Sequence, residues 1–403
     1  MTSTSAGVRT QQQRWVQAPL DVTFSVLDAW ADYATSAIGR GRVGPLDVLE
    51  DTLTWWKASQ IRTQPTWSSQ HTVVRSWPQA QLLDFSDLTG SAEGVPTLIL
   101  PPQAGHASTI VDYSDAQSQV RTAQAAGLDR VFVLSWNSAT QETSQSTIED
   151  FIEILDATVA QLGGRVNLVG DCQGGWLAVI YAALRPEAVA SLAVAGAPID
   201  FKIGQSAIQE WVRSLSGRGE LDFYQNLVTL GRGNHLGSNQ ILGFKMLEPA
   251  EEMVRNAALW GHIHDPVYVQ RHEDFENWFD WSHDLPGAFY LWIVEHLFIR
   301  NELVKGELVV GDSVVDLCRI TCPVFMLAGT TDHITPPAQM FALAGYVSTP
   351  ESDIEQDLVE AGHLGLFMGR AALAGPWSRV FSAIAELDAV SAAAAADAQS
   401  GEA

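Results

Sequence analysis

From about residue 70 onward, short apolar runs alternate with longer stretches whose apolar positions recur every three or four residues. The first pattern is typical of buried or half-buried strands, and the second of amphipathic helices. Strands are predicted at residues 71–77, 80–85, 97–102, 130–136, 166–170, 189–200, 322–329 and 354–362. Helices are predicted at residues 115–127, 148–162, 175–186, 336–347 and 376–387. In the helix that Thr147 opens, the apolar residues fall on one face: Ile148, Ile152, Leu155, Val159 and Leu162.

This alternation predicts an α/β fold with one mostly parallel central sheet. Strands separated by helices of roughly 10 to 16 residues form βαβ units, so helices are expected on both faces of the sheet. The alternation breaks at Phe201. Residues 201–305 have a mostly helical pattern and are rich in tryptophan, and we interpret them as an inserted cap that follows the sixth strand. The sheet domain is therefore expected in residues 61–200 and 306–388.

The two ends of the chain carry no sheet pattern. Residues 1–60 are expected to form a loose tail of about 14 residues followed by short helices, since apolar residues occur at helical spacing between Val22 and Trp56. The other end is alanine-rich and low in complexity, and residues 389–403 are predicted to be a disordered tail.

Composition and charge narrow the classes of partner. Hydrophobic residues make up 46% of the chain and charged residues 17%, which favours a large buried core. The net charge of -24 argues against a nucleic-acid partner. No run approaches the roughly 18 apolar residues of a transmembrane helix, and the start of the chain lacks a secretory signal pattern. A cytoplasmic protein is therefore expected.

The cysteines are too few for a disulfide framework. Only Cys172, Cys318 and Cys322 occur. The spacing of the last two could suggest a metal site, but no histidine or second cysteine pair accompanies them. Both are interpreted as packing residues, and neither a metal nor a cofactor is expected.

The most informative motif is LVGDCQGGW at residues 168–176, which places Cys172 between glycines at the end of a predicted strand and the start of a helix. A sharp turn from strand to helix needs small residues on both sides and exposes the side chain at its centre. An α/β-hydrolase keeps its nucleophile there, and a thiolate in that place suggests covalent acyl chemistry. A buried structural cysteine is the alternative. Asp171 beside it would oppose thiolate formation if it faced the site, so we expect it to point away.

An acid and a base follow in the order that this fold requires. Asp332 follows the predicted strand at residues 322–329, and His363 follows the one at 354–362. Both therefore lie at carboxyl ends of strands, where open parallel sheets place their active sites. Cys172, Asp332 and His363 are predicted to be nucleophile, acid and base. His333 is the alternative base, but the base is expected after the helix that follows the acid.

The remaining candidate site residues are backbone donors near Cys172 and aromatic side chains that could contact the substrate. The backbone N–H of Gln173 and that of Gln103 or Ala104 are the candidate oxyanion-hole donors. Candidate substrate-binding residues are His106, Trp176 and Trp281, because aromatic surfaces can hold an apolar acyl chain. The alternative for each is a purely structural role in packing.

Several segments resemble polyhydroxyalkanoate synthases and the related intracellular polyhydroxyalkanoate (polyhydroxybutyrate, PHB) depolymerases of the α/β-hydrolase superfamily. The resemblance covers about residues 95–385. Synthase-like segments are VFVLSWNSA, the cysteine motif, WFDWSHDLPGAFYLWIVEHLFIRNELVKGEL, VDLCRITCPVFMLAG and DHITP; depolymerase-like segments are PPQAGHAST, GAPID and GHLGLFMG. The resemblance implies an α/β-hydrolase fold and the roles already assigned to Cys172, Asp332 and His363. It leaves the subfamily open.

Both enzymes would form an acyl thioester on Cys172, and they differ in what attacks it. Water gives a hydrolase of polyester or its oligomers, whereas the hydroxyl of another hydroxyacyl unit gives a synthase that uses a 3-hydroxyacyl coenzyme A thioester as substrate. Coenzyme A phosphates prefer basic clefts, so the acidic chain favours hydrolysis. A third hypothesis is a non-catalytic relative that coats polymer granules. Association with a storage granule and a homo-oligomer stay open.

Overall fold

The computed structural model describes residues 11–86, 94–216, 221–248 and 250–401. The chain forms two compact units. The sheet unit comprises Thr66–Ala104, Ser108–Leu236 and His283–Ala403, and the helical unit comprises Met1–Pro65, Gly105–Ala107 and Gly237–Ser282. Among the described residues, no helix combines the length and the apolar character that crossing a membrane would need.

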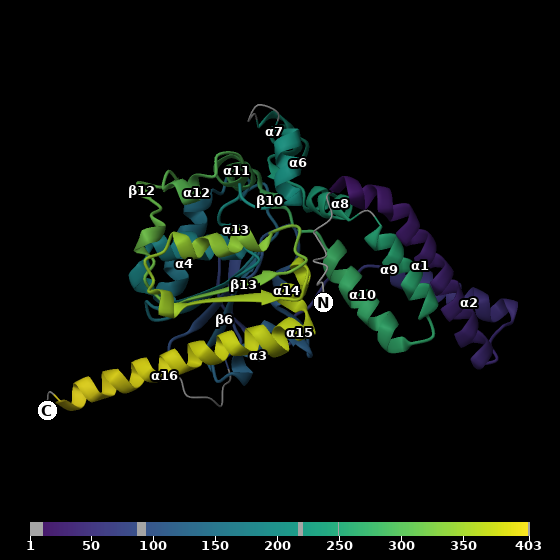
Figure 1. The fold of residues 1–403 in the computed structure, drawn as a ribbon, viewed down its shortest axis with the longest axis horizontal. Coiled ribbons are helices and arrows are strands. Elements are labelled where there is room, and N and C mark those ends of the chain that lie inside the picture. Colours follow the sequence, from purple (N-terminus) through teal and green to yellow (C-terminus); the bar gives the residue numbers. More distant parts are fainter. Residues whose placement is uncertain (1–10, 87–93, 217–220, 249, 402–403) are drawn as a thin grey trace, which may run out of the picture. The chain divides into compact units, whose positions relative to one another are not determined.

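A single large sheet forms the centre of the sheet unit (Figure 1). Eight strands of the described residues run in the order β1, β2, β6, β3, β7, β8, β13, β14. Their bounds are β1 Thr72–Ser76, β2 Ala80–Asp84, β3 Thr97–Leu100, β6 Val131–Trp136, β7 Val166–Asp171, β8 Val189–Ala195, β13 Val324–Gly329 and β14 Ile354–Val359. β1 and β2 pair in antiparallel fashion, and so do β2 and β6. All other neighbours in the sheet are parallel.

Helices cover both faces of this sheet, as parallel strands require. Figure 1 shows α3 and α16 on one face, and α4 and α13 on the other. The helices of the sheet unit are α3 Gln119–Ala125, α4 Ile148–Gln161, α5 Gln173–Leu184, α6 Ala207–Leu215, α7 Asp222–Leu230, α11 Gly287–Trp292, α12 Glu302–Lys305, α13 Pro337–Phe341, α14 His363–Met368, α15 Arg370–Ala372 and α16 Ser378–Gly401. Short two-stranded ladders join β4 Asp112–Ser114 with β5 Gln117–Ser118, β9 Asn234–His235 with β10 Leu285–Pro286, and β11 Val309–Val310 with β12 Ser313–Val314.

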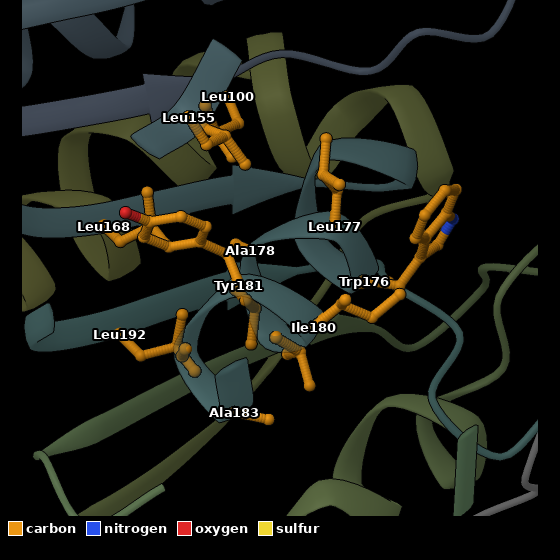
Figure 2. Packing of buried hydrophobic residues seen from close by; sticks show 14 of the residues in the cluster. Leu100, Leu155, Leu168, Trp176, Leu177, Ala178, Ile180, Tyr181, Ala183 and Leu192 are labelled. Atoms are coloured by element: carbon orange, nitrogen blue, oxygen red, sulfur yellow. The ribbon is translucent and has the colours of Figure 1, made fainter. Parts of the chain in front are cut away.

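The main core lies around α5. From Gly174 to Leu184, every residue of this helix is buried. Figure 2 shows its side chains packing with leucines of the neighbouring strands, among them Leu100, Leu168 and Leu192. A helix that is apolar on all sides must be enclosed by other elements. The start of α5, and with it Cys172, is therefore anchored in the most densely buried part of the unit.

The sheet, its parallel crossovers and the sharp turn between β7 and α5 confirm the predicted α/β-hydrolase fold. All eight predicted strands occur, although the strand predicted at residues 189–200 ends at Ala195. The helix predicted at residues 115–127 begins only at Gln119. The reason is the β4–β5 hairpin, in which the buried carboxylate of Asp112 accepts a hydrogen bond from the Ser118 hydroxyl at 2.7 Å.

The helical unit contains α1 Gln11–Gly39, α2 Pro45–Gln60, α8 Gly237–Leu247, α9 Glu251–Gly261 and α10 Pro266–Asp280. Tyr33 of α1 stacks on Trp260 of α9, with ring centroids 4.4 Å apart. Asp51 of α2 accepts a hydrogen bond from the Tyr33 hydroxyl at 3.0 Å, and its Oδ2 lies 2.9 Å from Nε2 of His264. Buried Glu276 pairs with Arg62 and Arg255. The contacts of Tyr33, Asp51 and Arg62 therefore join the N-terminal helices α1 and α2 to the segment that contains α9 and α10, much later in the chain.

The structure therefore divides the chain differently from the prediction for residues 1–60 and 201–305. The middle of the expected cap, Gly237–Ser282, packs with the N-terminal helices, while the rest of that segment belongs to the sheet unit. Residues 1–10 of the predicted N-terminal tail lie outside the described residues, and α1 begins at Gln11. Residues 389–401 of the predicted disordered tail are helical instead, because α16 continues to Gly401. Alanine has the highest helix propensity, so its run extends the helix.

Candidate active site

Cys172 lies on a sharp turn between the last residue of β7, Asp171, and the first residue of α5, Gln173. Its backbone has φ 49° and ψ -113°, in the region of positive φ that residues with a side chain rarely adopt. Its N–H donates to the carbonyl of Ala195 at 2.9 Å, so the strained turn is tied to β8. This is the geometry in which a nucleophile is presented at the end of a parallel strand.

Glycines make this turn sterically feasible. A Cβ atom on Gly170 would lie 2.5 Å from the carbonyl oxygen of Gly174. One on Gly174 would lie 2.1 Å from the carbonyl oxygen of Leu100, and one on Gly175 would lie 2.5 Å from Cβ of Ala197. Real Cβ atoms do not approach so closely, so the three glycines allow β7, α5 and β3 to meet at the turn.

The structure brings His363 and Asp332 together, although 31 residues separate them. Nδ1 of His363 lies 2.7 Å from Oδ2 of Asp332. Asp332 follows β13, and His363 is the first residue of α14, which follows β14. Oδ1 of Asp332 accepts hydrogen bonds from the backbone N–H groups of Ile334 and Thr335, both at 2.9 Å. The carboxylate therefore has a fixed orientation, with one oxygen left to orient the imidazole.

Electrostatics couple His363 to Cys172 as well as to Asp332. Burial alone would lower the pKa of His363, but the charge of Asp332, the charge of Cys172 and hydrogen bonds to both raise the pKa well above its usual value. The imidazole can therefore take the thiol proton and remain positively charged between two negative groups. The arrangement can generate a thiolate at Cys172.

Three side chains that the sequence did not single out hold the end of α14. Each donates a hydrogen bond to one of the last carbonyl groups of this helix, which have no partner within it. The bonds run from Trp377 Nε1 to Leu366 O (2.8 Å), from Gln119 Nε2 to Phe367 O (3.5 Å) and from Gln117 Nε2 to Met368 O (2.7 Å). No local pattern marks them, because the donors come from other parts of the chain.

The proposed oxyanion loop begins beside the turn. Leu100 at the end of β3 is the register partner of Gly170 on β7, so the loop that follows it leaves the sheet next to Cys172. Gln103 and Ala104 are both buried. Gln173 opens α5, where backbone N–H groups lack partners within the helix. The roles of Gln103, Ala104 and Gln173 stay predictions.

The structure corrects the assignment of Trp176 to substrate binding. Its side chain is 1% exposed and belongs to the main core (Figure 2). Its ring centroid lies 6.1 Å from that of Phe289 and 6.3 Å from that of Trp292. The whole of α5 from Gly174 to Leu184 is buried, so a side chain at this position is enclosed by other elements. Trp176 is therefore a packing residue.

His106 and Trp281, the other two predicted substrate contacts, belong to the helical unit. His106 stacks on Trp278, with ring centroids 4.8 Å apart, and also contacts the rings of Phe244 and Phe279. This position agrees with the structural alternative for His106. Their contacts with substrate stay predictions.

The other two cysteines lie away from this chemistry. Cys322 packs against the main core, and burial raises the pKa of its thiol to about 11. Cys318 is exposed, so its predicted packing role is wrong. Within the described ranges, no group of three or more histidine, cysteine or acidic side chains is placed to hold a metal ion.

Comparisons with known proteins give a family and several relatives. The family model described as "Protein of unknown function (DUF3141)" matches residues 76–395. The "Poly(3-hydroxyalkanoate) polymerase subunit PhaC" of Haloferax mediterranei is 27% identical over 322 residues, which cover 78% of this chain and 63% of the relative. The protein of the same name from Allochromatium vinosum is 28% identical, over 69% of this chain and 77% of the relative.

Solved structures also match, at low identity. A mutant of an epoxide hydrolase from Bacillus megaterium has a TM-score of 0.47 and 12% identity, and the match covers 79% of this chain and 100% of that one. The match to the Haloferax relative covers 63% of that protein, less than two thirds of its length, and the family model covers most of this chain. The chain belongs to the DUF3141 family, as a relative of the poly(3-hydroxyalkanoate) polymerases with an α/β-hydrolase fold.

Proposed function

We propose that the chain is an acyl-transfer enzyme that acts on polyhydroxyalkanoate-type substrates through a thioester on Cys172. The observation that carries the proposal is the hydrogen-bonded pair of His363 and Asp332, together with the electrostatic coupling of His363 to Cys172 on its strained turn. A thiolate, an adjacent base and a carboxylate that orients the base are the parts that acyl transfer requires.

The reaction runs in two steps. In the first, the thiolate of Cys172 attacks the carbonyl carbon of the acyl donor, and the resulting oxyanion is held by backbone N–H groups. The leaving group departs with the proton held by His363, and the acyl group stays on sulfur. In the second, His363 removes the proton of the acceptor hydroxyl, whose oxygen attacks the thioester and releases the thiolate.

The acceptor distinguishes a polymerase from a hydrolase. The relatives named polymerase support the hydroxyl group of a hydroxyacyl chain as acceptor and a coenzyme A thioester as donor. The net charge of -24 supports the second candidate, transfer to water, because coenzyme A is itself an anion. We give the first more weight, since net charge describes the whole chain without locating any charge at the site, and the relatives align with most of the chain.

The test offers both kinds of substrate to the purified protein. With 3-hydroxybutyryl coenzyme A, a polymerase releases free coenzyme A and forms polymer; with amorphous polymer, a hydrolase releases soluble hydroxy acids. Cys172→Ala should abolish either activity, whereas Cys318→Ala should not, because that thiol is exposed and away from the triad. Full activity of Cys172→Ala would refute the mechanism. Binding of polymer granules without turnover would support the non-catalytic alternative instead.

A further inference from the structure

The loop after β3, which carries the candidate oxyanion donors, passes from the sheet unit into the helical unit and back. Gln103 and Ala104 belong to the sheet unit, Gly105–Ala107 to the helical unit, and the chain returns to the sheet unit at Ser108. The three residues of the helical unit thus follow directly on the two whose backbone N–H groups are the candidate donors.

In the sheet unit, one tryptophan fixes both ends of this loop. Nε1 of Trp136 on β6 donates to the carbonyl of Pro101 at 2.8 Å. The backbone N–H of the same residue donates to the hydroxyl oxygen of Ser108 at 2.9 Å. Both hydrogen bonds are buried, so they fix where the loop begins and where it ends.

In the helical unit, the segment Gly105–Ala107 is held through its backbone and through a side chain. Nε1 of Trp278 on α10 donates to the carbonyl of Ala107 at 2.9 Å. The ring of His106 stacks on that of Trp278, with centroids 4.8 Å apart and planes 18° apart. A β-bridge pairs the backbone of His106 with that of Ser282. The middle of the loop therefore has its own anchor, separate from Trp136.

This anchor is tightly packed. Gly105 has a φ of 88°, and a Cβ atom there would lie 3.0 Å from Cβ of Gln240 on α8, so glycine suits the position. Trp278 is 2% exposed and Ala107 is also buried. Loss of their hydrogen bond would deprive a buried donor and a buried acceptor of a partner, which is costly. The bond therefore opposes movement of the segment.

We propose that Trp278 and His106 are positioning residues, which hold the loop that carries the candidate oxyanion donors. The part that concerns catalysis rests on the proposed function; the restriction of the loop does not. Backbone N–H groups stabilise an oxyanion best when they are fixed before the reaction, and a displacement of about 1 Å can cost roughly 100-fold in rate. The helical unit then contributes to acyl transfer through the three loop residues that it holds.

Hydrogen–deuterium exchange tests the restriction, read by mass spectrometry on the peptide that contains residues 103–108. Trp278→Phe keeps a ring for His106 to stack on but removes the N–H donor, so this peptide should exchange roughly tenfold faster than in the wild type. Trp260→Phe is the matched control and should leave the exchange of this peptide unchanged. Trp260 also packs in the helical unit, on Tyr33, but its Nε1 has no hydrogen-bond partner among the described residues. Unchanged exchange in Trp278→Phe would overturn the proposal.

Two reactions of Cys172 test the positioning role, because only one of them forms an oxyanion. In acylation by 4-nitrophenyl butyrate, followed as the burst of 4-nitrophenolate, the thiolate attacks the ester carbonyl and its oxygen becomes negative. In alkylation by iodoacetamide, the thiolate displaces iodide, which carries the negative charge away. Trp278→Phe should slow acylation roughly tenfold and leave alkylation within about twofold of the wild type. His106→Ala, which removes the ring from the loop itself, should have the same effect.

An equal loss of both reactions, or an unchanged ratio of their rates, would overturn the positioning role. A loss of acylation confined to His106→Ala would overturn it too and would support the predicted contact of His106 with substrate. If Trp278→Phe does not fold, His106→Ala decides the matter through the exchange of the loop peptide and the ratio of the two rates. Failure of the proposed function would instead appear as absent acylation in the wild type, with the exchange results unchanged.

Discussion

Replacing Asp332 by Asn should disable His363 as a base while leaving the size of the side chain unchanged. In the wild type, Oδ1 accepts from Ile334 and Thr335, and Oδ2 faces Nδ1 of His363 at 2.7 Å. The amide oxygen of Asn must keep the two backbone donors, so its NH₂ group takes the place of Oδ2 and donates to Nδ1. The imidazole is then held with its proton on Nε2 and cannot accept one from Cys172.

The magnitude follows from the chemistry of the thiol. The equivalent change in a Ser-His-Asp triad lowers kcat by about 10⁴, which corresponds to roughly 5.5 kcal/mol. A thiol partly ionises without help: with an ordinary pKa near 8.5, about 3% is thiolate at pH 7. Alkylation of Cys172 in Asp332→Asn should therefore fall about 30-fold at most. Turnover should fall by roughly 10³ to 10⁴, because both steps need the base.

The assay compares single-turnover formation of the acyl enzyme with alkylation across pH 6 to 9. Asp316→Asn is the matched control, since Oδ1 of Asp316 accepts from the N–H of Cys318 at 3.0 Å in a similar turn without a histidine. Its rates should equal those of the wild type. If folded Asp332→Asn retains turnover within about tenfold of the wild type, the assigned role of Asp332 is wrong.

Three further predictions concern stability. Gly174→Ala should cost about 3 kcal/mol or more, because its Cβ would lie 2.1 Å from the carbonyl oxygen of Leu100, whereas Gly345→Ala, with open space at that position, should be near neutral in thermal melts. Glu276→Gln breaks two ion pairs of a side chain that is 1% exposed and should lower stability by about 3 kcal/mol; an unchanged urea midpoint would contradict this. Burial raises the pKa of Asp171 in the folded state from 3.8 to about 8, so the folded chain binds this proton more tightly than the unfolded chain does. The wild type should therefore lose stability relative to Asp171→Asn as the pH rises from about 4 to 8. Melting temperatures at pH 5 and 8 measure this, and a constant difference between the two proteins would refute it.

The sequence determined the features that depend on local physics. The alternation of apolar strands and amphipathic helices is enough to predict a parallel sheet, because each element must bury one face or be enclosed. The glycines around Cys172 predict the turn, because only residues without a side chain fit there. Cys172, Asp332 and His363 follow the parallel strands β7, β13 and β14, and parallel strands bring their carboxyl ends to one edge of the sheet, so the sequence predicts that the three residues lie at that edge.

Tertiary structure alone decided the features that depend on distant parts of the chain. Trp176 looked available to substrate beside Cys172, but the direction of its side chain on α5 places it in the core. Residues expected in the cap pack with the N-terminal helices, because Trp260 and His264 find partners there. No local pattern singles out Gln119, whose hydrogen bond to the carbonyl of Phe367 at the end of α14 exists only because α3 and α14 come together in the fold. Local patterns fix which element forms and which residue types it presents, whereas the partner of a buried polar group is set only when the elements pack.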